Sequence, residues 1–431
     1  MFPFLKHFYC LSIYYMMILR YILQKGSPLL MINLHEKIQE LTPVLFEIYR
    51  DLHCHPELSE QEVRTAKQIS LWLHKWGIPY QDHVAGHGIV ALIESKNTSA
   101  THKKTVGIRA DMDALPIMES ASHICRSQNS GVMHACGHDA HVAIALGVAK
   151  ILKDMEHLLS GNVKFFFQPA EETIGGAKRM ISCGHMEHPH VDYMIGLHVM
   201  PNHESGTVEY RYGKLNASSD HIEITVHGKS CHGAYPEQGI DAIVIASHLI
   251  CSLQTLVSRS LSPLQSAVLS FGKIEGGERP NILCDCVTIQ GTLRTTDPDV
   301  RAHSLFYIER QVSLIAQSFG GSAHVTIQKG YAALINHDEI VTVIVQNAAQ
   351  LLGQKNLYEK EFPSLGVEDF SFFLEKTPGA FFHLGCGKKS EKKTAPLHSS
   401  EFELDESCIP IGVELQLMNV FSLLAKETDL I

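Results

Sequence analysis

The sequence predicts an α/β protein: a catalytic domain with a mostly parallel sheet flanked by helices, and a smaller α+β domain inserted into it. Apolar segments of strand length alternate with helical segments up to residue 216 and again after residue 330, which is typical of a parallel sheet covered by helices. Between residues 217 and 330 the order becomes β-α-β-β-α-β, as in a ferredoxin-like domain. The predicted domains are therefore 31–216 with 331–431, and the insertion 217–330.

The catalytic domain is predicted to begin with two helices. Apolar residues between Leu34 and Leu52 recur three and four positions apart, which indicates one buried helical face. Residues 59–62 have the composition of a capping box at the start of a second helix, and Gly77 suits its end. The elements predicted next are strands at 88–94, 105–110, 163–168 and 193–198, a helix from the segment 133–141 to about residue 152, and a helix at 176–183.

The second half of the chain is predicted in the same way. The insertion contains strands at 221–226, 267–273, 284–294 and 323–328 and helices at 239–259 and 300–319. The chain then returns to the catalytic domain with helices at 340–352, 368–374 and 409–424 and a strand at 380–384.

Residues 1–30 differ from the rest of the chain and are predicted to be an extension ahead of the catalytic domain. Their aromatic-rich apolar run between Lys6 and Arg20 is shorter than the roughly 20 residues of a membrane span. No small-residue cleavage site of a secretory signal follows it. A membrane-surface anchor remains an alternative.

Composition excludes several classes of function. The net charge of −10 and the lack of a basic cluster argue against a nucleic-acid partner, which requires a basic face. Eleven cysteines without paired CxxC spacing do not indicate a disulfide scaffold, so we expect a cytoplasmic protein. The 27 histidines favour metal binding, because imidazole is the commonest side-chain metal ligand.

Residues 133–141 concentrate metal-binding side chains. The segment MHACGHDAH contains one thiol, three imidazoles and one carboxylate directly before an apolar helical run. A single buried cysteine is usually a small apolar core residue, but flanking histidines favour a metal site. We therefore predict that Cys136 and His138 form half of such a site.

The other half is expected where further strands end, because the carboxyl ends of parallel strands meet at one edge of the sheet. Glu171 and Glu172 follow the strand at 163–168, His198 closes the strand at 193–198, and His398 lies near the end of the chain. Each has a structural alternative: a solvated helix start for the glutamates, a core histidine for His198, and a loop residue for His398. Their joint fit favours five ligands: Cys136, His138, Glu172, His198 and His398.

These ligands suit two divalent ions that share the Cys136 sulfur. Such ions acidify a bound water and polarise a carbonyl group. Glu171 is then placed to take the proton from the water and pass it to a leaving nitrogen.

The insertion contributes three more candidates. His232, in the segment 229–234, could donate a hydrogen bond to an oxyanion, and an ordinary polar loop is the alternative. Asn281 and Arg294 could hold a substrate carboxylate, for which arginine is well suited. An exposed arginine with a structural role is the alternative.

The motifs resemble a known superfamily in order and identity. The chain is similar to the dinuclear-metal amidohydrolases of the aminoacylase and carboxypeptidase-type metallopeptidase superfamily. The most similar branch contains hippurate hydrolases, N-acyl-amino-acid amidohydrolases and plant auxin-conjugate hydrolases. The resemblance extends from about Leu34 to Leu424 and depends on DLHCHPEL at 51–58, RADMDALP at 109–116, the 133–141 segment, QPAEE at 168–172, GLHV at 196–199, EDF at 368–370 and PLHS at 396–399.

This resemblance implies two metal ions per subunit, the same five ligands, and Glu171 as catalytic base. It implies that Asp113 orients a ligand histidine rather than binding metal, and that His134 and His141 have supporting roles. It also implies that the inserted domain closes over the active site and forms a homodimer or homo-oligomer, with His232 reaching the substrate.

The leading hypothesis is hydrolysis of N-acyl amino acids, such as hippurate, to a carboxylic acid and a free amino acid. A dipeptidase or exopeptidase that uses the same site is one alternative, and a catalytically silent metal-binding protein is another. Zinc, manganese, cobalt and nickel all suit the ligand set.

Overall fold

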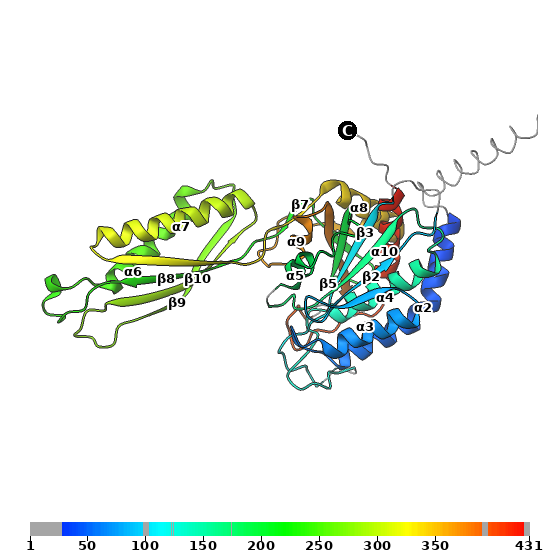
Figure 1. Ribbon diagram of the computed structural model, residues 1–431, viewed down its shortest axis with the longest axis horizontal. Helices are drawn as coiled ribbons and strands as arrows, with labels where there is room; N and C mark the ends of the chain where they lie inside the picture. Colours follow the sequence, from blue (N-terminus) through cyan, green and yellow to red (C-terminus); the bar gives the residue numbers. More distant parts are fainter. Residues whose placement is uncertain are drawn as a thin grey trace, which may run out of the picture. The chain divides into compact units, whose positions relative to one another are not determined.

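The computed structural model describes residues 28–97, 103–121, 123, 125–173, 175–389 and 395–425. The chain divides into two compact units. The first consists of residues up to Tyr212, Asn336–Lys360 and residues from Phe373 onward, and the second of Gly213–Ile335 and Glu361–Phe372. Figure 1 shows a sheet with surrounding helices in each unit.

The first unit is built on an eight-stranded mixed sheet with the order β1-β2-β4-β3-β5-β14-β6-β13. Its centre is parallel, because β3 pairs in parallel with β4 and β5, and β5 pairs in parallel with β14. The β1–β2, β2–β4 and β14–β6 pairs are antiparallel. The strands are β1 (Tyr80–Val84), β2 (Gly88–Ile93), β3 (Thr105–Asp111), β4 (Asn162–Gln168), β5 (Tyr193–Glu204), β6 (Val208–Tyr210), β13 (Leu357–Glu359) and β14 (Gly379–Gly387).

Helices cover both faces of this sheet, as the sequence predicts. Phe165 and Phe167 of β4 belong to the main core, which α4 fills with Val142, Leu146 and other apolar residues. Phe166 points to the other face, where its ring packs 5.3 Å from that of Phe373, as expected for a strand whose side chains alternate. The helices are α2 (Pro28–Cys54), α3 (Val63–Lys75), α4 (His138–Asp154), α5 (Gly176–Ser182), α8 (Asp338–Leu352), α10 (Cys408–Ala425) and the second half of α9 (Ser371–Leu374).

The second unit has the predicted β-α-β-β-α-β order. Its antiparallel sheet runs β11-β8-β10-β9, and α6 and α7 pack on it around a separate apolar core that includes Ile224, Leu249 and Ile308. The elements are β8 (Asp220–His227), α6 (Ala242–Leu253), β9 (Ala267–Gly276), β10 (Cys286–Thr295), α7 (Pro298–Ser318) and β11 (Ser322–Lys329). A two-stranded sheet of β7 (Gly213–Asn216) and β12 (Leu334–Asn336) accompanies it.

Several elements differ from the sequence-based expectation. The predicted helix at 239–259 is α6 followed by a π-helical turn at Leu256–Ser260, and the predicted helix at 368–374 is only the four-residue α9. Residues 361–372, which the sequence places in the catalytic domain, belong to the second unit. Their backbone explains this, because Ala217 N donates to Ser364 O at 2.9 Å and Arg294 to Leu365 O at 2.9 Å.

The predicted capping box at residues 59–62 does not form. Helix α3 begins at Val63, and its N-cap residue Glu62 makes no side-chain capping bond. The side chains of Ser59 and Glu62 instead contact residues far away in the sequence, as described for the metal centre below. Helix α2 starts at Pro28, three residues before the predicted domain boundary at residue 31, and residues 1–27 of the predicted extension lie outside the described residues.

Two described helical stretches have the length and hydropathy of a membrane span, Ala242–Ser260 and Cys408–Ala425. Both also have a place in a folded core. The buried residues of α10 belong to the core of the first unit, and Ile245 and Leu249 of α6 to that of the second. Length and composition alone are therefore weak evidence for a membrane span.

Candidate metal centre

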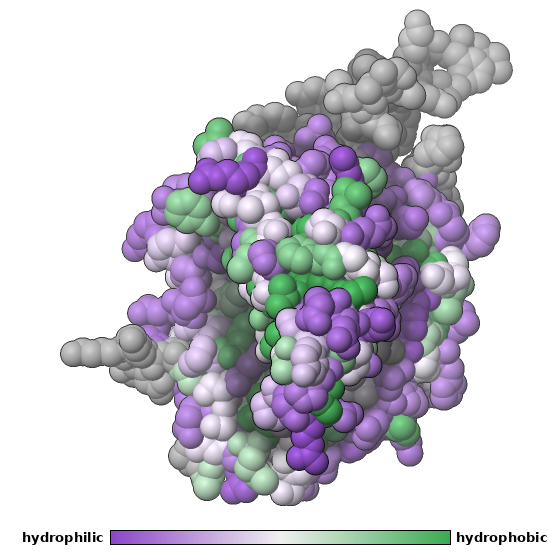
Figure 2. All heavy atoms as spheres, turned by 90° about the vertical axis from the view of Figure 1, so that its left-hand side faces the viewer, coloured by the Kyte–Doolittle hydropathy of each residue, from purple (hydrophilic) through white to green (hydrophobic). Residues whose placement is uncertain are grey.

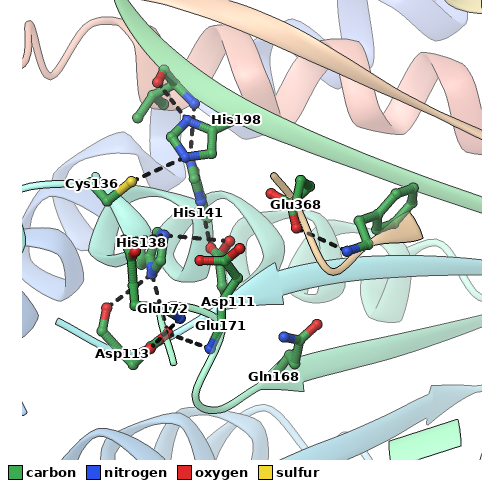
Figure 3. Close-up of polar contacts among 12 residues, drawn as sticks. Asp111, Asp113, Cys136, His138, His141, Gln168, Glu171, Glu172, His198 and Glu368 are labelled. Atoms are coloured by element: carbon green, nitrogen blue, oxygen red, sulfur yellow. Dashed lines mark hydrogen bonds and ion pairs between the residues drawn. The ribbon is translucent and has the colours of Figure 1, made fainter. Parts of the chain in front are cut away.

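The first unit brings the predicted ligands together at one edge of its sheet, and Figure 3 shows Cys136, His138, Glu172 and His198 among them. Asp111 ends β3, Glu171 and Glu172 follow β4, and His138 begins α4. His198 lies within β5 rather than at its end, but the pairing of β3 with β5 stops at Gly196. His198 therefore lies level with the carboxyl end of β3. The prediction that His198 closes its strand is wrong, but its side chain still lies at the predicted edge of the sheet.

The backbone around these residues adopts unusual conformations. Gly137 has φ +79°, and a Cβ there would lie 2.3 Å from the Val199 side chain, so only glycine fits between Cys136 and α4. Ala170 and His398 have φ of +54° and +61°, values that cost a residue other than glycine about 1 kcal/mol or more. His398 is held there by a hydrogen bond from its N–H to Ala135 O at 2.9 Å.

The Cys136 sulfur is the centre of the cluster. It lies 3.3 Å from His198 Nε2 and 3.3 Å from His398 Nε2, and Glu172 Oε1 is 3.3 Å from the same nitrogen of His398. Cys136 and His198 are buried, whereas half of the His398 side chain is exposed. The cluster thus reaches solvent on the side of His398.

The donor atoms form two overlapping groups, each compact enough for one metal ion. Cys136, His138 and His198 make one group, and Cys136, Glu172 and His398 the other, with all donor atoms of a group within 4.8 Å of one another. Only Cys136 is common to both. The five predicted ligands therefore fall into two groups that could each hold one ion and that share the Cys136 sulfur.

The two buried imidazoles present the correct nitrogen to such ions. His138 Nδ1 donates to Asp113 O at 2.9 Å, and His198 Nδ1 donates to Val199 O at 2.7 Å, so in the neutral form of each ring Nε2 carries the lone pair that a metal ion binds. Nε2 of His138 is buried without a hydrogen-bond partner among the described residues. A buried nitrogen without a hydrogen-bond partner is consistent with a metal ligand, and carbonyl-oriented histidines are typical of metal sites.

His134 and His141, which are predicted to have supporting roles, differ from the candidate ligand histidines in their hydrogen bonds. Both nitrogens of His141 are used, since Nδ1 donates to Asp111 Oδ1 at 2.6 Å and Nε2 accepts from Val199 N at 2.9 Å. His134 is buried, and neither of its ring nitrogens has a hydrogen-bond partner among the residues described. Burial lowers the pKa of His134 to about 4, so its ring is neutral.

Asp111 is a neighbour of the site that the ligand prediction missed. Its carboxylate pairs with Arg109 and lies 3.5 Å from His138 Nε2. Burial alone would raise its pKa, but the charges of Arg109 and His138 hold it well below the usual range. The position of Asp111 at the end of β3, two residues before Asp113, was the signal available in the sequence.

Asp113 positions both the ligand histidine and the two glutamates. Its Oδ1 is 3.3 Å from His138 Nδ1, and its carboxylate accepts hydrogen bonds from Glu171 N at 3.1 Å and Glu172 N at 3.0 Å. Glu171 is buried, and its carboxylate lies within 4.8 Å of the donor atoms of His138 and Glu172. A base is therefore held directly beside the candidate metal site.

Two residues that the sequence assigned to a capping box support this arrangement. Ser59 Oγ donates to Asp113 Oδ2 at 2.6 Å. The fully buried Glu62 accepts a hydrogen bond from Ala170 N at 2.8 Å, the residue with positive φ directly before Glu171. The turn before α3 thus holds the backbone that presents Glu171 and Glu172.

The pKa values of the candidate ligands indicate which protons the site carries when no metal ion is bound. Burial raises the pKa of the Cys136 thiol well above its usual value and lowers that of His198. Burial would also lower the pKa of His138, but the Asp111 carboxylate raises it well above 6.5. Binding of a cation therefore displaces protons from Cys136 and His138, since only the thiolate and the neutral imidazole are ligands.

The three remaining candidates lie in the second unit. His232 is exposed, and its Nδ1 accepts from Ala234 N at 3.0 Å, so the neutral ring carries its proton on Nε2. Asn281 is its neighbour, because Gly233 N donates to Asn281 O at 2.8 Å. Arg294 is half-buried in β10.

Comparison with known proteins identifies the family. The model for peptidase family M20/M25/M40 matches residues 107–418. The chain belongs to this family. The matched region contains all five candidate ligands and Glu171.

Curated relatives match nearly the full length of the chain. A probable hydrolase of Synechocystis is 40% identical over 87% of this chain and 94% of its own. Thermostable carboxypeptidase 1 of Saccharolobus solfataricus is 36% identical over 88% and 95%. The N-acetyl-L-cysteine deacetylase of Bacillus subtilis is 37% identical over 86% of both chains.

Solved structures agree with this assignment. A putative aminohydrolase from methicillin-resistant Staphylococcus aureus has a TM-score of 0.86 and 34% identity, covering 91% of this chain and 99% of its own. A dinuclear metal-binding peptidase of the M20 family from Bacillus subtilis has a TM-score of 0.77 and 31% identity, with coverage of 90% and 99%. The protein is therefore a metal-dependent hydrolase of the M20 family.

Proposed function

We propose that the protein hydrolyses the amide bond of N-acyl amino acids and releases a carboxylic acid and a free amino acid. The observation that carries this proposal is the pair of donor groups that share Cys136, with the buried Glu171 beside them. The similarity to an N-acetyl-L-cysteine deacetylase supports this substrate class.

The proposed ligands of two divalent ions are Cys136, His138, Glu172, His198 and His398, and zinc, manganese, cobalt and nickel all suit them. When bound, such ions lower the pKa of a water and polarise a carbonyl oxygen. Glu171 takes the proton of the attacking water and delivers it to the leaving amide nitrogen.

The residues of the second unit are proposed to act on the rest of the substrate. His232 donates a hydrogen bond from Nε2 to the oxyanion that forms from the acyl carbonyl. Arg294 and Asn281 hold the carboxylate of the amino acid. Mutation of each residue separates the roles: loss of His232 should mainly lower kcat, and loss of Arg294 should mainly raise KM.

Replacement of the proposed base tests the mechanism. Glu171→Gln keeps the size and the backbone hydrogen bond to Asp113 but cannot accept a proton, so we expect kcat on N-acetyl amino acids and hippurate to fall at least about 100-fold. Metal content, measured by mass spectrometry of the elements, should stay at the wild-type value. Turnover near the wild-type rate would contradict the role of Glu171.

The shared ligand is tested separately. Cys136→Ala should bind fewer than two metal ions per chain, because both donor groups contain this sulfur. Cys386→Ala, which also removes a buried thiol, serves as the control and should retain both ions. Two tightly bound ions in Cys136→Ala would exclude a bridging sulfur.

A dipeptidase or carboxypeptidase is the second candidate function, and the similarity to a carboxypeptidase favours it. The same site can attack a peptide carbonyl, so the distinction lies in the substrate. The kcat/KM values of the metal-loaded protein for hippurate and N-acetyl amino acids, compared with those for dipeptides and N-blocked peptides, decide between the two.

A further inference from the structure

Cys54 and Cys125 form a pair of thiols outside the candidate metal centre. They are 71 residues apart in the sequence, yet their Sγ atoms lie 3.0 Å from each other. Cys54 is the last residue of α2, and Cys125 lies in the segment that leads to residues 133–141. Both side chains are partly exposed, so neither is sealed in the core.

Backbone contacts hold the two cysteines at this distance. Gln128 N donates to Cys54 O at 2.8 Å, and Asn129 Nδ2 donates to Pro56 O at 2.8 Å. The Cys125 thiol also points at Arg50 O, 3.6 Å away. A bond between the sulfurs therefore requires them to approach by about 1 Å, because a disulfide is close to 2 Å long.

A pocket lies beside Cys125 of this pair. Cys125 lines a pocket of about 780 Å³ together with Tyr49, Arg50, His53 and Leu404. Two of its charged side chains, Arg50 and Glu406, are paired with each other at 2.6 Å. A pocket of this volume admits a molecule as small as hydrogen peroxide to the Cys125 side chain.

The pair adjoins a buried network that reaches the metal centre. His53, next to Cys54, contacts Asp139 at 2.6 Å and Glu119 at 3.0 Å. Asp139 follows the candidate ligand His138 in α4. Glu119 accepts from Ser127 N at 2.6 Å, in the same segment as Cys125.

We propose that Cys54 and Cys125 are a redox site that hydrogen peroxide converts to an intramolecular disulfide bond. One sulfur of the pair attacks a peroxide oxygen as its thiolate, the O–O bond breaks, and a sulfenic acid and water form once a proton is taken up. The other sulfur then attacks the sulfenic acid sulfur, loses its proton and displaces a second water. Two thiols and one peroxide thus give one disulfide and two waters, and an excess of a small thiol reverses the reaction.

The disulfide would join the end of α2 to the segment that carries the first metal ligands. Closing a loop of this length restricts the unfolded chain. We therefore expect oxidation to raise the unfolding temperature of the metal-loaded protein by about 3 °C or more.

Peptide mapping tests the bond directly. Metal-loaded protein is treated with hydrogen peroxide, alkylated and digested with trypsin without reduction. We expect one linked pair, residues 51–64 joined to residues 110–126, with a mass two hydrogens below the sum of the peptides, because each contains a single cysteine. Dithiothreitol should abolish it. Absence of this pair, or linkage of either peptide to another cysteine instead, would overturn the proposal.

Matched variants test its consequence. Cys54→Ser and Cys125→Ser should lose the rise in unfolding temperature on oxidation, whereas Cys183→Ser, which removes an exposed cysteine, should keep it. An equal rise in Cys54→Ser would show that another group is responsible and would contradict the proposal.

Discussion

At the scale of single residues, the conformation of the backbone before Glu171 depends on a buried carboxylate. Ala170 has positive φ, and its N–H donates a hydrogen bond to the Glu62 carboxylate at 2.8 Å. Burial raises the pKa of Glu62 to about 7, so placing it there is costly for the folded protein. A carboxyl group kept at such a cost is consistent with a positioning role for the two glutamates that follow.

Replacing Glu62 tests this role. Glu62→Ala leaves the Ala170 N–H without its acceptor, so we expect kcat to fall about tenfold or more with a smaller change in KM, and the free energy of unfolding to fall by about 2 kcal/mol. Glu62→Gln retains an acceptor oxygen and should recover most of kcat. The control is Glu60→Gln in the same turn, whose exposed side chain pairs with Arg179. Equal effects on kcat in all three variants would contradict a positioning role.

At the scale of elements, the sequence predicts those whose pattern is local. The apolar strand β4, the amphipathic helices and the β-α-β-β-α-β order are visible as runs and periods. The location of the candidate ligands Glu172 and His198 could be predicted because neighbouring parallel strands end at one edge of the sheet. Ser59 and Glu62 could not be assigned in this way, because their partners Asp113 and Ala170 are 54 and 108 residues away. The short strands β6 and β13 depend on pairing with distant segments.

Elements α2 and α4 are joined by an ionic network around His53. Burial alone would lower the pKa of His53, but Asp139 and Glu119 raise it to about 10, and His53 in turn helps to lower that of Glu119 to about 2. The raised pKa of His53 contributes stability below its unfolded value of 6.5 that is lost as pH rises through 10. The lowered pKa of Glu119 contributes stability above 4.5 that is lost as pH falls through 2.

The network should therefore stabilise the fold most between about pH 4.5 and 6.5. The free energy of unfolding, measured with urea, should be lower at pH 9 than at pH 6 in the wild type. This decrease should exceed the decrease in His53→Gln by up to about 3 kcal/mol. His190→Gln, which removes an exposed histidine paired with Glu187, should behave like the wild type. An identical pH dependence in His53→Gln would show that His53 is not charged in the folded protein.

At the scale of the whole molecule, the second unit carries apolar side chains on its surface. Ile243 and Val244 of α6 are 48% and 42% exposed, and Ile274 of β9 is 54% exposed. Strand β9 forms an edge of its sheet, and Figure 2 shows apolar side chains among polar ones on the molecular surface. Exposed apolar patches and open strand edges are typical of protein interfaces.

We propose that two copies associate through this surface of the second unit, so the chain of 47.9 kDa should elute as a dimer in size-exclusion chromatography with light scattering. Ile274→Lys places a charge on the edge strand and should shift the equilibrium to monomer, with the dissociation constant rising at least about tenfold. Leu71→Lys, at a 50% exposed position of α3 in the first unit, is the control. A dimer equally stable in Ile274→Lys would place the interface elsewhere.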